Sequence, residues 1–246
     1  MKYFATLFLS AALFVACSGE SSDPIAPASN GKTSSSVKSS NSNRAQCKVE
    51  IDENCIKDDR DGQTYRTVKI GDQVWMAENL NFETDSSFCY NNEESNCAKY
   101  GRLYRWAAAV GKSESECGYG KTCSLPSGNI QGVCPSGWHL PSTAEWETLF
   151  NAVGGQSTAG KVLKSTSGWD SGNGTDSFGF SALPAGERYD TGDYSYEGDG
   201  AKFWSSTENN SIGAYYIYLF FNLDDVRLYY CSKYYGFSVR CLQDNP

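Results

Sequence analysis

The chain has 246 residues, of which 39% are hydrophobic and 14% aromatic, and its formal net charge is −8. A chain of this length and composition can bury the core of one large domain. An acidic chain without a basic patch argues against a nucleic-acid partner. The sequence therefore predicts one globular domain that binds no nucleic acid.

The N-terminus has the pattern of a bacterial export signal. A lysine precedes an apolar run, 3–15, that is too short for an ordinary membrane anchor. Residues 14–17 (FVAC) resemble a lipobox, with phenylalanine where leucine is commoner, and Ser18 fits sorting to the outer membrane. We expect a signal peptide over 1–16, a lipid on Cys17 that holds the protein to the membrane, and an outer-membrane lipoprotein of the cell envelope. Plain secretion is the alternative.

A serine-rich segment follows the lipobox. Ser18 to Gln46 holds ten serines and almost no large apolar side chain, so it cannot offset the entropy of ordering. We expect a flexible tether that spans on the order of 30 Å, with a glycosylated stalk as the alternative. The tether, 17–57, ends in a short cysteine-containing segment, and the folded domain is expected over 58–246.

Ten cysteines in an exported chain predict disulfide bonds, because the compartment beyond the inner membrane is oxidising. No CxxC pair is present and the chain has one histidine, so no metal site is expected. Short spacings favour three local bridges, and three cysteines and the lipidation candidate remain outside them. The three bridges join Cys47 to Cys55, Cys89 to Cys97 and Cys117 to Cys123, and Cys134, Cys231 and Cys241 remain.

The first half of the domain predicts a hairpin and a helix. Turn signals at Asp61-Gly62 and Gly71-Asp72 bracket strand-like runs over 64–70 and 73–77. Residues 58–62 lack the spaced acidic ligands of a calcium loop. Further on, apolar residues recur at helical spacing in YGRLYRWAAAVG, which predicts a helix closed by a glycine. Its apolar positions are Leu103, Trp106, Ala107 and Val110, and the glycine is Gly111.

The stretch CPSGWHLPSTAEWETLF, 134–150, is the most explicit part of the chain. Two prolines hold the approach extended, and Ser142 with Glu145 three residues later forms a capping box at a helix start. One apolar stripe follows, and Gly154-Gly155 ends the helix. The stripe consists of Trp146, Leu149, Phe150 and Val153.

The last third of the chain predicts strands. Residues 154–200 are rich in Gly, Ser and Asp and are expected to form long loops; a calcium site over 170–176 is disfavoured because the closing glutamate is absent. Aromatic and β-branched runs separated by turns then follow. We expect 203–206, 214–221, 225–231 and 236–242 to be antiparallel strands of one sheet.

Six motifs in this order resemble the Fibrobacter succinogenes major paralogous domain over about 58–244. The resemblance implies a compact, disulfide-stapled α+β domain, distantly similar to the C-type lectin-like fold and the formylglycine-generating enzymes, with two helices flanking a small antiparallel sheet and long loops. It also implies a bridge between Cys134 and Cys241, because both lie in family motifs, which leaves Cys231 free or alternatively paired. The motifs are DGQTYRTVKIGDQVWMAENL, YGRLYRWAAA, CPSGWHLPSTAEWETL, FSALPAGER, FWSSTE and YGFSVRCLQD.

For function, the favoured hypothesis is a non-catalytic binding or adhesion domain for polysaccharide or a cell-surface protein. The loop 186–200 runs straight into 203–208, so loop and strand end are expected to form one shallow cleft. The bland alternative is that the aromatics belong to the core and the polar groups to turns. Stacking candidates are Tyr189, Tyr194, Tyr196, Trp204 and Tyr215, and hydrogen-bonding candidates are Glu208, Asn209, Asn210, Asn222, Asp224 and Asp225.

Two other hypotheses are kept. A structural envelope protein needs no ligand. An oxidase like the formylglycine-generating enzymes needs a cysteine pair that binds copper, and Cys231 with Cys241 fits poorly because Cys241 is assigned to Cys134. His139 is the sole histidine, and we expect it to be buried and structural. No spacing singles out a carboxylate pair. We therefore expect no catalytic residue and no cofactor.

Overall fold

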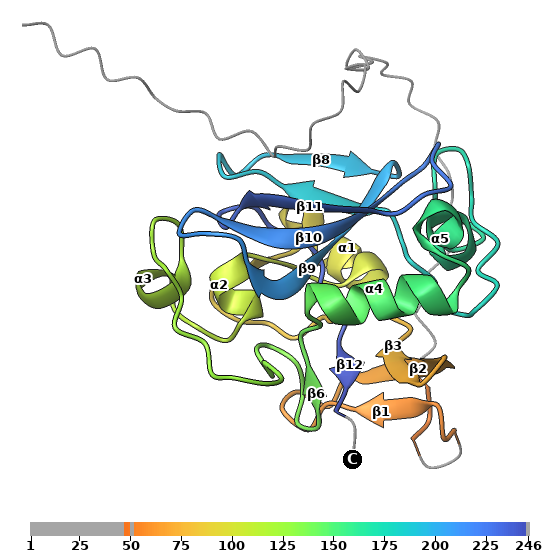
Figure 1. The fold of residues 1–246 in the computed structure, drawn as a ribbon, viewed down its shortest axis with the longest axis horizontal. Coiled ribbons are helices and arrows are strands. Elements are labelled where there is room, and N and C mark those ends of the chain that lie inside the picture. The colour runs from red at the N-terminus through yellow and green to blue at the C-terminus, as the bar shows by residue number, and fades with distance from the viewer. Residues whose placement is uncertain (1–46, 50–51, 245–246) are drawn as a thin grey trace, which may run out of the picture.

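In a computed structural model, residues 47–49 and 52–244 form an α+β domain (Figure 1). The predictions for the signal peptide, Cys17 and most of the tether lie outside these described residues. Two five-stranded sheets and a two-stranded one are joined by short helices within the described part. No helix in the described ranges has the length and apolar character that a membrane span requires.

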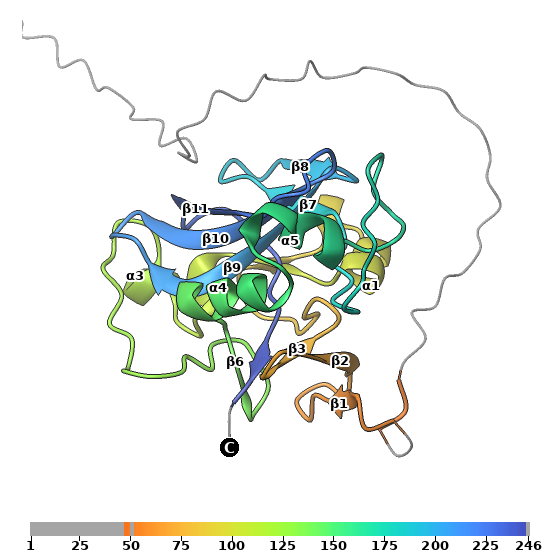
Figure 2. The same ribbon diagram turned by 45° about the vertical axis from the view of Figure 1, so that its right-hand side comes forward.

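The first sheet has the order β1-β2-β3-β12-β6 and contains both the earliest and the last strands (Figure 2). Thr67 lies opposite Met76 and Gly71 takes a positive φ of 60° at the turn, so the predicted hairpin is confirmed. The C-terminal strand then lies between β3 and β6, because Leu242 pairs with both Trp75 and His139. The strands are β1 Cys55–Lys57, β2 Thr64–Ile70, β3 Gln73–Met76, β6 Trp138–His139 and β12 Leu242–Gln243.

The second sheet has the order β11-β10-β9-β7-β8. The prediction that 236–242 joins this sheet as a strand holds only for two isolated bridges, Gly236 to Arg188 on β7 and Ser238 to Phe203 on β9, and the segment is not a continuous strand. Only Leu242–Gln243 is a strand, and it belongs to the first sheet, where the Cys134–Cys241 bond holds it. The sheet is also not purely antiparallel, because β7 runs parallel to β9. Its strands are β7 Ala185–Arg188, β8 Tyr194–Glu197, β9 Gly200–Glu208, β10 Gly213–Phe220 and β11 Arg227–Ser232.

Helix α4, Thr143–Ala152, confirms the capping-box prediction. The Ser142 side chain accepts from the backbone of Glu145, and the Glu145 carboxylate accepts from the backbone N–H of Ser142 at 2.8 Å. Trp146, the first residue of the apolar stripe, packs on Trp75 at 4.6 Å between ring centroids. The helix thereby joins the first sheet to a core cluster that also includes residues of the second.

The helix predicted over 103–110 is shorter than expected. Only Trp106–Ala109 is helical (α2), whereas Leu103–Tyr104 forms strand β5, which pairs with β4, Ser87–Phe88. Tyr104 also bridges to Phe237, so long-range pairing overrides the local helical spacing. The expectation of two helices is likewise wrong, since the described residues contain three others. They are α1 Glu94–Tyr100, α3 Glu114–Cys117 and α5 Gln156–Leu163, with a short 3-10 turn at Tyr90–Asn92.

All four predicted disulfides are present, which confirms that the domain is disulfide-rich. The Cys134–Cys241 bridge spans 107 residues, and the bridged Cα atoms lie 5.9 Å apart. Cys231 is buried and also disulfide-bonded, so the option of a free thiol is wrong. The three local bridges are Cys47–Cys55, Cys89–Cys97 and Cys117–Cys123.

Candidate functional site

The stacking and hydrogen-bonding candidates do not converge on one cleft. Glu208 and Asn209 lie at the β9–β10 turn, and Asn222 and Asp224 lie at the β10–β11 turn. These turns are at opposite ends of the eight-residue strand β10, which at about 3.3 Å per residue is roughly 25 Å long. The loop 186–200 is itself the β7–β8 hairpin at the edge of the sheet. It lies beside the start of β9, where Gly186 pairs with Ala201, and not beside the strand end at Glu208.

Several candidates have internal roles. Trp204 is fully buried, and its indole donates to the carbonyl of Tyr104 at 2.7 Å, so it cannot stack on a ligand. Tyr194 packs on Tyr90 at 5.2 Å and donates from its hydroxyl to Asn92 at 2.8 Å. Tyr215 packs against Tyr230 at 6.2 Å. The prediction is wrong for Trp204, which belongs to the core.

The polar candidates at the β9–β10 turn support the fold. Glu208 accepts hydrogen bonds from the backbone of Cys123 at 2.9 Å and from the ammonium of the fully buried Lys233. The backbone of Asn209 donates to the carbonyl of Gly213 at 3.0 Å, and the Asn210 side chain accepts from that glycine's N–H at 3.0 Å. These contacts are what a tight turn requires.

A buried lysine holds the β10–β11 turn, which carries the remaining polar candidates, through hydrogen bonds to its backbone. Lys164 is buried, and its ammonium donates to the carbonyls of Phe220, Phe221 and Leu223, each at 3.0 Å. Burial lowers the pKa of Lys164. Asn222 and Asp224 are exposed on this turn. Asp224 lies 3.6 Å from the ammonium of Lys161, and Asp225 pairs with Arg227 at 3.2 Å.

Six tyrosines do converge, on one side of the second sheet. Tyr189 and Tyr196 come from the β7–β8 hairpin, and four others come from β10, β11 and the segment after β11. Ring contacts link Tyr189 to Tyr235 at 5.5 Å and Tyr216 to Tyr229 at 6.3 Å. We call this group the tyrosine cluster; its members are Tyr189, Tyr196, Tyr216, Tyr218, Tyr229 and Tyr235.

A buried ion pair lies within the tyrosine cluster. The ammonium of Lys202 on β9 lies 2.6 Å from the carboxylate of Glu187 on β7, and both side chains are less than a tenth exposed. Lys202 is directly opposite Tyr218 in the β9–β10 register, so both side chains project from the same side of the sheet. The ion pair and the tyrosine cluster therefore lie on the same side of the second sheet.

Burial and the charge of Glu187 raise the pKa values of four tyrosines of the cluster. Burial, and then the charge of Glu187, raises the pKa of Tyr189 and of Tyr216. Burial and then Tyr196 and Glu187 raise the pKa of Tyr218. Burial, Asp190 and Glu187 raise the pKa of Tyr235 to about 12. These hydroxyls are protonated near neutral pH, so each can donate and accept a hydrogen bond.

The cluster combines a ring surface with hydroxyls at the protein surface. Tyr196 is 38% exposed, Tyr216 is only 3% exposed, and the other members are half-buried. Aromatic rings with a polar end suit ligands that present both an apolar face and hydroxyls. Tyr189 and Tyr196 were predicted from the sequence. Glu187, Lys202 and the other four tyrosines were not, although Tyr216, Tyr218 and Phe220 alternate along β10 as one strand face requires.

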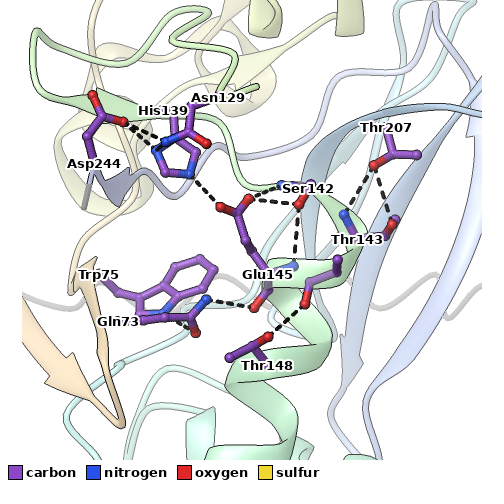
Figure 3. Close-up of polar contacts among 11 residues, drawn as sticks. Gln73, Trp75, Asn129, His139, Ser142, Thr143, Glu145, Thr148, Thr207 and Asp244 are labelled. Atoms are coloured by element: carbon purple, nitrogen blue, oxygen red, sulfur yellow. Dashed lines mark hydrogen bonds and ion pairs between the residues drawn. The ribbon is translucent and has the colours of Figure 1, made fainter. Parts of the chain in front are cut away.

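The sole histidine has a different environment (Figure 3). His139 Nδ1 lies 2.7 Å from a carboxylate oxygen of Asp244, and Nε2 lies 2.9 Å from a carboxylate oxygen of Glu145. Ser142 donates to the other Glu145 oxygen from its backbone and its hydroxyl, and Asn129 donates to Asp244. The network ties β6, the start of α4 and the C-terminal strand together, and within the described part of the chain the ring's hydrogen-bond partners include no hydroxyl or thiol group.

Both carboxylates favour the charged imidazole. Burial alone lowers the pKa of His139, but the hydrogen bonds and charges of Glu145 and Asp244 outweigh burial and leave the pKa raised. Burial raises the pKa of Glu145, but His139 and the Ser142 donors outweigh it and leave that pKa lowered. His139 is 2% exposed, so the expectation of a buried, hydrogen-bonded histidine is confirmed.

Two other places on the surface have features of a binding site. The described residues contain one group of three potential metal ligands, Cys89, Glu94 and Cys97, and its two sulfurs are bonded to each other. A depression of about 390 Å³ lies near the end of α2, but its one aromatic ring, Phe82, is covered by Arg60 at 3.8 Å. Neither place offers the stacking surface that the tyrosine cluster has.

Comparison with known proteins finds the family. The model of the Fibrobacter succinogenes major domain matches residues 68–243, which is more than half of the chain and lies within the range of the six motifs. No curated protein and no solved structure matches the chain. The chain belongs to the Fibrobacter succinogenes major domain family.

Proposed function

We propose that this chain is a lipid-anchored protein of the outer membrane and cell envelope, that its domain is a non-catalytic binding module, and that the tyrosine cluster binds polysaccharide. The observation that carries the proposal is the convergence of six tyrosines around the buried Glu187–Lys202 pair. Sugar rings have apolar faces that stack on aromatic rings and hydroxyls that exchange hydrogen bonds with tyrosine. The relation to the C-type lectin-like fold is part of the same proposal.

An envelope protein without a ligand is the second candidate, and a protein partner is the third. An oxidase like the formylglycine-generating enzymes has little support, because Cys241 is bonded to Cys134 and Cys231 is also in a disulfide. The aromatic exposure separates the first two candidates. A purely structural domain gains nothing by leaving Tyr196 more than a third exposed over a buried ion pair.

The binding test uses the full chain and a panel of immobilised neutral and acidic polysaccharides. Retention by at least one of them is expected. Tyr196→Ala should weaken it by roughly 1–2 kcal/mol, about tenfold in affinity, because a partly exposed stacking ring is removed.

Tyr234→Ala is the matched control, since Tyr234 is 37% exposed but lies outside the cluster. Equal losses in the two variants would place the binding surface elsewhere. No retention of the wild type on any polysaccharide would favour the ligand-free or protein-binding candidate.

The anchor is tested separately. Metabolic labelling with a palmitate analogue should mark the wild type and leave Cys17→Ala unlabelled, because only Cys17 follows a lipobox-like sequence. An unlabelled wild type in the culture fluid would indicate plain secretion.

A further inference from the structure

The tyrosine cluster already contains a cation. The Lys202 ammonium lies 4.9 Å from the ring centroid of Tyr218, 5.0 Å from that of Tyr196 and 5.7 Å from that of Tyr216. These distances are typical of cation–π contacts. An internal ammonium therefore occupies the position that a ligand cation would take in an aromatic cage, so these rings do not form such a cage for a ligand.

The other cations beside the cluster are engaged. The Arg227 guanidinium lies 3.2 Å from the carboxylate of Asp225 and donates to the hydroxyl of Tyr229 at 3.3 Å. The Arg188 guanidinium lies 4.0 Å above the ring of Phe88 and donates to a backbone carbonyl. Lys202 itself is neutralised by Glu187 at 2.6 Å. Arg227 and Lys202 are thus compensated by carboxylates. Arg188 has no carboxylate partner among the described residues, but its single positive charge is outnumbered by the carboxylates of Asp170, Asp190 and Asp199.

Carboxylates without a cation lie at the edge of the cluster. Asp190 directly follows Tyr189 in the chain, and the Asp199 backbone donates to the carbonyl of Tyr196 at 3.1 Å. The charge of Asp190 raises the pKa of Tyr235, and that of Asp199 raises the pKa of Tyr218. Neither makes an ion pair among the described residues. Asp170 adds a further negative charge near Asp199. The electrostatic potential at this edge should therefore oppose carboxylates, sulfates and phosphates.

We infer that the tyrosine cluster selects uncharged, hydroxyl-rich polysaccharide over acidic polysaccharide. This inference rests on the proposed function and adds the ligand class. Stacking on Tyr196 and hydrogen bonds with protonated tyrosine hydroxyls recognise a neutral sugar, whereas the edge carboxylates exclude anions.

The test compares two polymers of β-linked sugars that differ in charge. The full chain is immobilised and exposed at low salt to hydroxyethyl cellulose, which is neutral, and carboxymethyl cellulose, which is acidic. We expect at least tenfold tighter binding of the neutral polymer. Its binding should change less than twofold between 10 and 200 mM salt, because no ion pair forms.

A gain-of-binding variant tests the cause. Asp190→Asn combined with Asp199→Asn should raise the affinity for carboxymethyl cellulose at least threefold and leave the affinity for hydroxyethyl cellulose unchanged. The control is Asp59→Asn combined with Asp72→Asn, because it changes the net charge equally at two exposed positions outside the cluster. An equal gain in the control would assign the effect to net charge and overturn the inference.

The remaining outcomes separate the two levels of the proposal. Tighter binding of carboxymethyl cellulose than of hydroxyethyl cellulose, lost in Tyr196→Ala, would overturn the ligand class and keep the binding function. Failure of the wild type to bind both polymers, and also the panel of neutral and acidic polysaccharides, would overturn the binding function and this inference with it.

Discussion

Each of the two sheets buries a basic side chain next to a carboxylate, and the surroundings of the two side chains differ. In the first sheet, His139 lies between two carboxylates, whose other partners are a helix cap and the Asn129 side chain (Figure 3). In the second sheet, Lys202 has one carboxylate, and tyrosine rings surround the rest of its ammonium. A buried basic group alone therefore does not identify a functional site. The groups around it indicate its role, because hydrogen bonds in a helix cap stabilise the fold, whereas half-exposed hydroxyls can contact a ligand.

The largest expected effect concerns the Cys134–Cys241 disulfide bond, which holds the C-terminal strand in the first sheet. Cys134→Ser and Cys241→Ser should each lower the free energy of unfolding by about 4–5 kcal/mol, because the bridge closes a loop of about a hundred residues. The double variant should be little worse than either single one, since all remove the same bond. Urea denaturation measures the loss.

The same variants sharpen the comparison between the sheets. At temperatures where they remain folded, their polysaccharide binding should match the wild type, because the bridge lies outside the tyrosine cluster. Additive stability losses in the double variant would contradict a shared bond. A parallel loss of binding would show that the two regions are coupled.

A slightly smaller loss is expected in the second sheet. Lys202→Met should destabilise the domain by about 3–5 kcal/mol, because it leaves Glu187 buried without its cation. Adding Glu187→Gln should recover much of this loss, since the unpaired charge disappears. Denaturation of the single and double variants checks this. A double variant as unstable as Lys202→Met would show that packing of the lysine stem matters more than its charge.

The smallest effect is a pH dependence from the first sheet. The folded pKa of His139 is raised above 6.5, so its stabilising contribution is complete below the unfolded pKa and disappears as pH rises through the folded pKa. The folded pKa of Glu145 is lowered below 4.5, so its stabilising contribution is complete above pH 4.5 and disappears as the pH falls through the folded pKa. The stability that this pair contributes should therefore be highest between pH 4.5 and pH 6.5. The decline above pH 6.5 should be about 1–2 kcal/mol, as hydrogen bonds between charged groups contribute, because the Glu145 and Asp244 carboxylates that face the buried His139 are partly exposed.

Glu145→Gln is the control for the pH dependence. Glutamine can still close the capping box, so helix α4 keeps its start while the charge on one side of His139 is removed. The decline between pH 6.5 and 9 should be smaller in this variant. Equal declines in variant and wild type would mean that another group titrates in this range.

The sequence predicts those features that neighbouring residues determine. The Ser142–Glu145 cap, the 64–76 hairpin and the three short-range disulfides each depend on residues less than about a dozen positions apart. The β12 strand could not be placed in this way, because Leu242 pairs with Trp75 and His139, over a hundred residues away. The prediction that Leu103 lies in a helix was wrong for a similar reason, since the helical spacing competes with the strand pairing of Leu103 to Phe88.

Only the part of the candidate site that neighbouring residues determine could be predicted from the sequence. Tyr189 and Tyr196 stand out because a polar loop rarely exposes tyrosines. Tyr216 and Tyr218 sit in an apolar strand and resemble core residues, and only the paired strands show that they share one side with Lys202. Trp204 lies on the same sheet but is covered by Phe237 at 4.3 Å, which no local pattern indicates.

The central claim is that the tyrosine cluster is the surface that contacts polysaccharide, and chemical protection tests it in the unaltered protein. Tyr196 and Tyr234 are almost equally exposed, at 38% and 37%, so tetranitromethane should nitrate both in the free chain. With a saturating polysaccharide chosen from the retention panel, peptide mass spectrometry should show nitration of Tyr196 reduced at least fivefold and nitration of Tyr234 unchanged. Unchanged nitration of Tyr196 in the bound chain would contradict the account.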